Sequence, residues 1–118
     1  MASALVVIRH APYGGSLARA GVDTALAAAA FEQAVTLLFL GDGVLNLLPQ
    51  QDARAVGSRN LERLLASLPL YDIDTVYADA ASLARHGIAA ETLPDFARSM
   101  DAEGVRELLA RSDHLLGF

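Results

Sequence analysis

Three side chains that can bind a metal ion or transfer a proton each stand at the end of a predicted buried strand: His10, Asp42 and Asp79. In open α/β sheets, ligands bind outside the carboxyl ends of the strands, where the strand order reverses. If the three strands are neighbours, a histidine and two carboxylates converge there. Such a set suits a divalent metal ion, or a general base with an orienting acid. A stand-alone small-ligand or metal-dependent enzyme that uses these residues is therefore one interpretation of the sequence.

The same residues also have ordinary structural roles. Asp79 stands where the N-cap of a helix over residues 80–86 is expected, and Asp42 lies in a Gly-Asp-Gly turn. His10 would then be a residue of a loop. We favour this structural interpretation, which makes the three residues at most the remnant of a site and predicts neither a catalytic residue nor a metal site.

Missing residue types exclude whole classes of chemistry. The chain of 118 residues has no cysteine, so it can form no thiolate metal site or thiol nucleophile and cannot itself carry a persulfide. All nine basic residues are arginines, which leaves no lysine for a Schiff base or a Walker-type phosphate loop. There is no dinucleotide-binding glycine motif and no serine-hydrolase elbow, and we expect no cofactor.

The elements that must position these residues alternate along the chain. Continuous apolar runs, typical of strands buried on both faces, cover residues 5–8, 35–40 and 75–78, with shorter candidates at 93–97 and 114–118. Helical patterns over 17–31, 52–68, 80–86 and 101–111 separate them. The alternation predicts a single domain over residues 1–118, a flavodoxin-like open parallel sheet with strand order 2-1-3-4-5 and helices on both faces.

The chain carries more apolar surface than one small domain needs. Hydrophobic residues make up 53% of it, and the loop after the second predicted strand is unusually apolar. That loop could be a short amphipathic helix packed on its own domain, or part of a subunit interface. We predict an oligomer whose contact surface contains the apolar residues of this loop and of a second apolar loop: Val44, Leu45, Leu47, Leu48, Leu70 and Tyr71.

The charge and hydropathy of the chain indicate where in the cell it acts and which kinds of partner it can bind. No apolar run approaches the ~20 residues that span a bilayer, and the start of the chain lacks the basic region of a signal peptide. The formal net charge of −5 argues against direct contact with nucleic acid. We expect a cytoplasmic protein with neither a membrane nor a nucleic acid as its direct partner.

Three segments together resemble a known family: Gly41–Gln51, Leu70–Ile73 and Ala80–Gly87, in this order and spacing. The likeness extends to Ala11–Gly14 and to a Gly-x-Asp-x-x-Leu pattern over residues 21–26. In these motifs, which span nearly the whole chain, the sequence resembles the DsrE/DsrF-like sulfur-relay family, most closely its TusC (DsrF) type of subunit.

This resemblance implies a flavodoxin-like subunit of a hetero-oligomer with TusB-like and TusD-like chains, arranged as a dimer of heterotrimers. Such a complex passes persulfide sulfur to a TusE-like protein and on to the enzyme that makes 2-thiouridine at the tRNA wobble position. The same type of subunit also serves dissimilatory sulfur oxidation, and the residues do not separate the two pathways.

The resemblance also implies where the chemistry of such a complex lies. In the TusD-like subunit, the sulfur-accepting cysteine lies at the end of the third strand, and the matching position here is Asp79. A carboxylate cannot accept sulfane sulfur. The sequence therefore predicts a non-catalytic subunit that positions its cysteine-bearing partner. The alternatives are the enzyme described above and a flavodoxin-like module that binds a small ligand.

Overall fold

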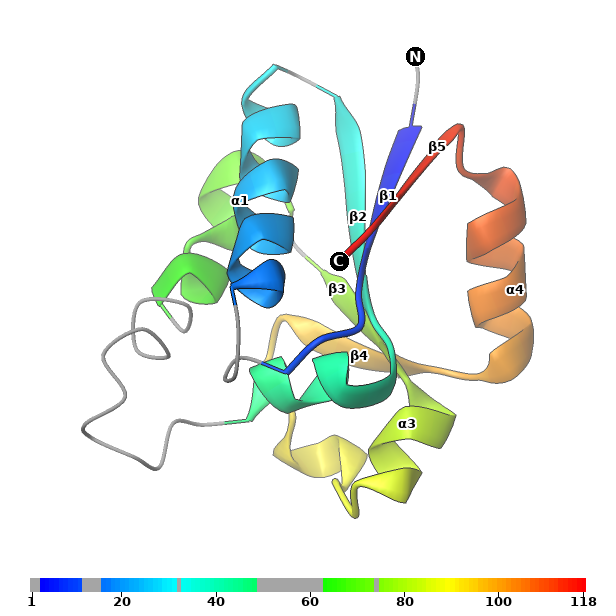
Figure 1. The fold of residues 1–118 in the computed structure, drawn as a ribbon. Coiled ribbons are helices and arrows are strands. Elements are labelled where there is room, and N and C mark those ends of the chain that lie inside the picture. Colours follow the sequence, from blue (N-terminus) through cyan, green and yellow to red (C-terminus); the bar gives the residue numbers. More distant parts are fainter. Residues whose placement is uncertain (1–2, 12–15, 32, 49–62, 74) are drawn as a thin grey trace.

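A computed structural model describes residues 3–11, 16–31, 33–48, 63–73 and 75–118, and its centre is a parallel sheet (Figure 1). The strands are β1 (Ser3–Ile8), β2 (Ala34–Phe39), β3 (Val76–Asp79), β4 (Ala97–Met100) and β5 (His114–Gly117). The α-helices are α1 (Leu17–Ala30), α3 (Ala80–Arg85) and α4 (Ala102–Arg111), and 3-10 helices cover Gly41–Leu47, Leu68–Tyr71 and Ala90–Thr92. Of the helix predicted over 52–68, residues 52–62 lie outside the described residues, and residues 63–66 are helical.

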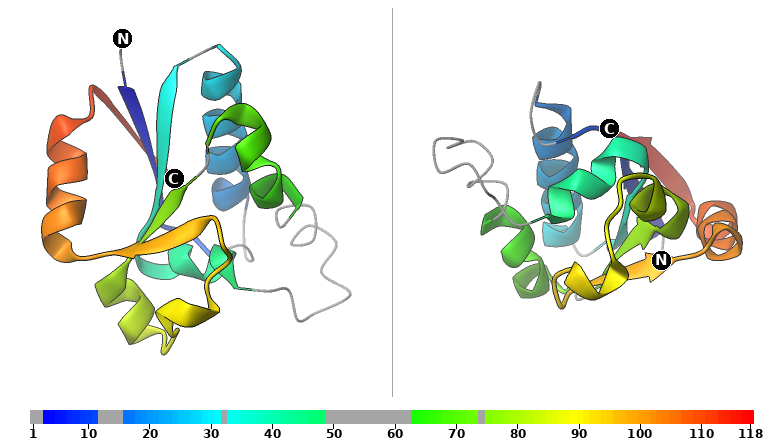
Figure 2. Two further views of the ribbon diagram at one scale, coloured as in Figure 1. Left: turned by 180° about the vertical axis from the view of Figure 1, so that it is seen from behind. Right: turned by 90° about the horizontal axis from the view of Figure 1, so that it is seen from below.

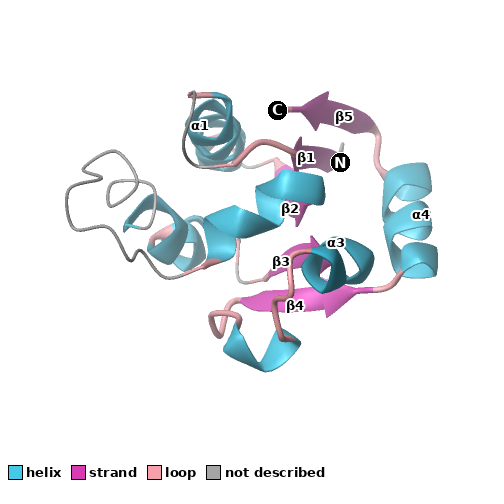
Figure 3. Ribbon diagram, turned by 60° about the horizontal axis from the view of Figure 1, so that its bottom comes forward, coloured by secondary structure: helices cyan, strands magenta, loops and turns pink. Residues whose placement is uncertain are grey.

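The sheet confirms the predicted flavodoxin-like architecture but corrects the predicted strand order. All neighbouring strands are parallel, and helices cover both faces (Figure 3). The order is β4-β3-β2-β1-β5, so the prediction 2-1-3-4-5 is wrong. The centre of the sheet is β2, which pairs with β1 at Leu38↔Val7 and with β3 at Leu38↔Tyr77.

Alternating side chains of β1 divide the core into two layers. Val6 and Ile8 face α1, where they pack with Val22 and Ala25. Leu5 and Val7 face the other way, and with Leu38 of β2 they pack against Leu108 of α4. The residues of β1 from Ala4 to Ile8 are buried, as the continuous apolar run predicts.

Among the described residues, different features of the sequence position the two longest helices. Small residues let α1 approach the sheet closely, since a Cβ on Gly21 would lie only 3.0 Å from Ile8 Cγ1. The α4 helix begins at Asp101, whose side chain accepts a hydrogen bond of 2.8 Å from the Gly104 N–H. Within the described ranges, no helix is long and apolar enough to cross a membrane.

Candidate functional site

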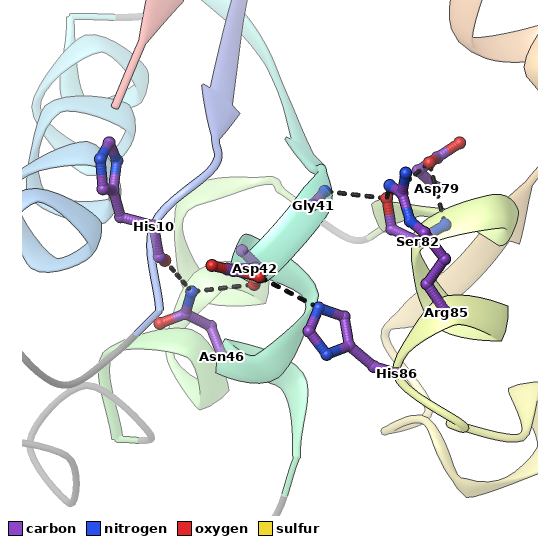
Figure 4. A network of polar contacts seen from close by, with 9 residues as sticks. His10, Gly41, Asp42, Asn46, Asp79, Ser82, Arg85 and His86 are labelled. Atoms are coloured by element: carbon purple, nitrogen blue, oxygen red, sulfur yellow. Dashed lines mark hydrogen bonds and ion pairs between the residues drawn. The ribbon is translucent and has the colours of Figure 1, made fainter.

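The carboxyl edge of the sheet brings together the strand ends from which His10, Asp42 and Asp79 project. Because β2 lies between β1 and β3, Asp42 follows the middle strand of the three. The Gly41–Leu47 helix and α3 lie next to each other beneath this edge (Figure 2). The three side chains nevertheless have different partners, and Figure 4 shows those of Asp42 and Asp79.

His10 is held by the end of the chain. Its Nδ1 atom lies 2.7 Å from the main-chain oxygen of Phe118, an atom that can only accept, so the imidazole donates. Phe118 also accepts from the Arg9 N–H at 3.2 Å. His10 is therefore bound to the segment that follows β5 and not to either carboxylate.

Asp42 pairs with a histidine that lies outside the predicted set of site residues. Its Oδ1 lies 3.2 Å from Nε2 of His86, at the C-terminal end of α3 (Figure 4). The Asp42 carboxylate is largely exposed, so the pair contributes little to stability. It does connect the Gly41–Leu47 helix to α3.

Asp79 caps α3, as predicted, and it also holds a buried hydroxyl. Its Oδ2 accepts from the Ser82 N–H at 3.1 Å and from the Ser82 hydroxyl at 2.6 Å. Ser82 is completely buried, and its oxygen accepts from the Gly41 N–H at 2.8 Å and from Arg85 Nη2 at 3.1 Å. The carboxylate thereby fixes the start of the Gly41–Leu47 helix through Ser82.

A third connection at this edge is made by Asn46, which is almost fully buried. Its Nδ2 donates to the His10 carbonyl at 2.9 Å and to the Gly43 carbonyl at 2.8 Å. These two acceptors fix the orientation of the amide, because a flipped amide would place its oxygen against both carbonyls. Asn46 ties the end of β1 to the Gly41–Leu47 helix.

Gly43 makes this close packing possible. A Cβ at this position would lie 1.9 Å from the main-chain oxygen of Ile8. No side chain fits there, so the Gly41–Leu47 helix rests directly on the backbone of β1.

In the part of the chain that the structure describes, the three side chains thus make separate structural connections at this edge. Among the described residues, no group of three or more His, Cys, Asp or Glu side chains could hold a metal ion. Ser82 could have been found from sequence, because it stands three residues after the N-cap, where a capping partner is common. His86 and Asn46 had no comparable signal, since their partners depend on the strand order.

The predicted interface residues separate into two sets. Val44 and Leu47 are buried in the core of the chain, so their place in the predicted contact surface is corrected: the Gly41–Leu47 helix turns them toward the sheet. Leu45 and Leu48 are only partly buried, and Leu70 and Tyr71 are exposed. Figure 1 shows the Leu68–Tyr71 helix beside α1, away from the Gly41–Leu47 helix below the sheet.

Comparison with known proteins agrees with this architecture. The profile of the DsrE/DsrF-like family matches residues 2–118. A relative from Pseudomonas aeruginosa named Protein TusC homolog is 36% identical over 114 residues, which cover 97% of this chain and 96% of the relative. A second Protein TusC homolog, from Vibrio parahaemolyticus, is 36% identical over 118 residues and is covered completely, as is this chain.

A solved structure supports the fold alone. The crystal structure of the ychN protein from E. coli superimposes with a TM-score of 0.86 at 21% identity, and each chain is covered completely. On the match of the family profile and the identity to full-length relatives, the chain belongs to the DsrE/DsrF-like family.

Proposed function

We propose that this chain is a non-catalytic, cytoplasmic subunit of a sulfur-relay complex of the TusBCD type. The complex would contain TusB-like and TusD-like chains as a dimer of heterotrimers. It would pass persulfide sulfur to a TusE-like protein for 2-thiouridine formation at the tRNA wobble position. The names of the full-length relatives support membership of a relay, and the chemistry of the carboxyl edge supports the passive role.

The observation that carries the proposal is the state of Asp79. By the family resemblance, its position at the end of β3 is the one at which TusD-like subunits carry their sulfur-accepting cysteine. Its carboxylate accepts hydrogen bonds from the backbone N–H and the hydroxyl of Ser82, so it is engaged in structural contacts. With no cysteine in the chain, the sulfur must stay on a partner.

The part of the predicted contact surface best suited to hold a partner is Leu70 with Tyr71. Leu70 is 85% exposed at the end of a short 3-10 helix, where its backbone is held by the Ser67 carbonyl. An apolar side chain presented in this way on a fixed turn has little role in its own fold. A partner would gain from covering it.

The test is assembly with the TusB-like and TusD-like chains of the same source, measured as native mass after co-expression. The wild-type chain is expected to co-purify with both, and the Leu70→Arg variant is expected to be lost from the complex. Because Leu70 is exposed, the variant should unfold at the same denaturant concentration as the wild type. Leu109→Arg, which alters an exposed leucine of α4 on the opposite face, is the matched control and should assemble normally. A wild-type chain that ignores both partners would overturn the proposed function.

A further inference from the structure

The two edges of the sheet differ in their protection against pairing with another strand. The outer edge of β4 carries the exposed Arg98, a charge of the kind that discourages pairing. The β5 strand forms the other edge of the sheet (Figure 3). It has no Asp, Glu, Lys or Arg, and all of its residues are exposed. An exposed edge without such charged side chains is a template for a further strand.

The hydrogen bonds show which backbone groups of this edge are free to pair. Phe118 donates to the Val7 carbonyl at 2.8 Å and accepts from the Arg9 N–H at 3.2 Å, so its backbone faces β1. Residues of a parallel strand face a given neighbour alternately. Leu116 therefore faces β1 as well, and the N–H and C=O groups of Leu115 and Gly117 point away from the sheet.

The side chains of the same residues are apolar on both faces. Leu115 pairs with Leu5 of β1 and so lies on the α4 face, and Leu116 pairs with Val6 and lies on the α1 face. Leu115 is 58% exposed and Leu116 is 40% exposed. A strand added beside β5 would cover both side chains.

We propose that β5 pairs with β5 of a second copy of this chain, antiparallel, around a two-fold axis at Leu116. Leu115 then stands opposite Gly117 of the second copy, and each such pair exchanges both backbone hydrogen bonds. The two Leu116 side chains stand opposite each other in the closely spaced pair between them. The sheet continues from one copy into the other.

The sequence of β5 favours a second copy over an unrelated strand because it complements itself about this axis. The outward-facing residues Leu115 and Gly117 lie symmetrically about Leu116, so each meets the other across the axis. Beside Gly117 on the α4 face lies only the end of the exposed Arg9 side chain, with Nη2 3.5 Å from the Cβ position. Within β5 itself no Asp, Glu, Lys or Arg stands opposite its own copy, and like charges directly opposite each other would disfavour the pair. This inference does not rest on the proposed function, since it concerns only the contact of the chain with itself.

Two substitutions at the outer edge test the pairing without touching the bonds to β1. Leu115→Pro removes an N–H that only the second copy uses, and proline is tolerated at a solvent-facing edge position. Gly117→Val fills the space that Leu115 of the other copy needs. In its own chain, the new Cβ would make only an ordinary contact of 3.5 Å with Arg9 Nη2.

Sedimentation of the full chain should show a wild-type dimer at micromolar concentration and a dissociation constant raised about tenfold or more in both variants. Leu109 of α4 is about as exposed as Leu116 but lies outside the proposed contact, so the Leu109→Arg variant should remain a dimer. Unchanged denaturation curves would show that the variants are folded. A wild-type chain that is monomeric at every concentration, or variants that dimerise normally, would overturn the proposal.

A cross-linking measurement gives an independent answer, because the wild-type chain has no cysteine. In the Leu116→Cys variant the two thiols face each other across the axis. The distance between the two Cα atoms of such a closely spaced pair is one that a disulfide can bridge. Mild oxidation should convert this variant to a covalent dimer much faster than it converts Leu109→Cys. Equal rates for the two variants would contradict the pairing.

Discussion

At the scale of single residues, the carboxylate of Asp79 has two structural tasks that experiment can separate. It caps α3, and it accepts the hydroxyl of the buried Ser82. Asp101 caps α4 in the same way but is exposed and holds no buried hydroxyl among the bonds of the described residues. Substitutions of Asp79 and Asp101 can therefore be compared to separate the capping of a helix from the binding of Ser82.

The Asp79→Ala variant should lose about 2 kcal/mol of unfolding free energy, because the cap is lost and a buried hydroxyl is left without its acceptor. Asp101→Ala should lose about 1 kcal/mol, the ordinary effect of a missing cap. Denaturant titration of both variants measures the difference, and equal losses would contradict the second task of Asp79.

The same Asp79 variant also separates a structural role from a chemical one. A complex that has assembled with the Asp79→Ala chain should transfer sulfur at the wild-type rate, measured as 2-thiouridine formed on tRNA. A slower transfer by a fully assembled complex would show that the carboxylate acts on the relay itself.

At the scale of elements, the Gly41–Leu47 helix depends on direct contact with the backbone of β1. Gly43→Ala should destabilise the chain by about 3 kcal/mol or more, since the new methyl group meets the Ile8 carbonyl, which cannot move aside. Gly87→Ala is the control: its positive φ of 66° makes alanine unfavourable, but nothing lies within 4 Å of the new methyl group. The control should lose about 1 kcal/mol in the same titration.

The existence and type of most described elements could be predicted from sequence, because an apolar run or helical stripe indicates which residues of an element are buried. The strand expected over 93–97 is an exception, since β4 covers Ala97–Met100. Which strands lie next to each other in the sheet could not be predicted from sequence. The runs in β1 and β2 are alike, and either could occupy the centre of a parallel sheet. The predicted order placed the first strand between the second and the third, and so put His10 between Asp42 and Asp79. The actual order places β2 between β1 and β3 and lets Asp42 reach His86.

The apolar 41–48 segment shows a related limit. Its composition indicated that part of it must be covered, and the structure shows that its own domain covers Val44 and Leu47. Composition alone could not tell the chain's own sheet from a partner, because both would bury the same side chains. Val44 and Leu47 point toward the sheet because the helix packs at Gly43 directly on the backbone of β1. This contact is a property of the tertiary fold.

At the scale of the whole molecule, the two proposed contact surfaces belong to different parts of the chain. Leu70 lies on the short helix beside α1, and β5 forms the edge of the sheet. One surface would hold unlike partners and the other a second copy. In a dimer of heterotrimers these contacts are distinct, so substitutions in them should give different products.

In the co-expressed complex, Leu115→Pro should halve the native mass while all three kinds of chain stay together, because only the two-fold contact is lost. Leu70→Arg should instead remove this chain from its unlike partners and leave its self-association intact. Native mass spectrometry distinguishes the products directly. If Leu115→Pro released the chain from its partners, β5 would be a contact with an unlike subunit, and the two-fold axis would have to lie elsewhere.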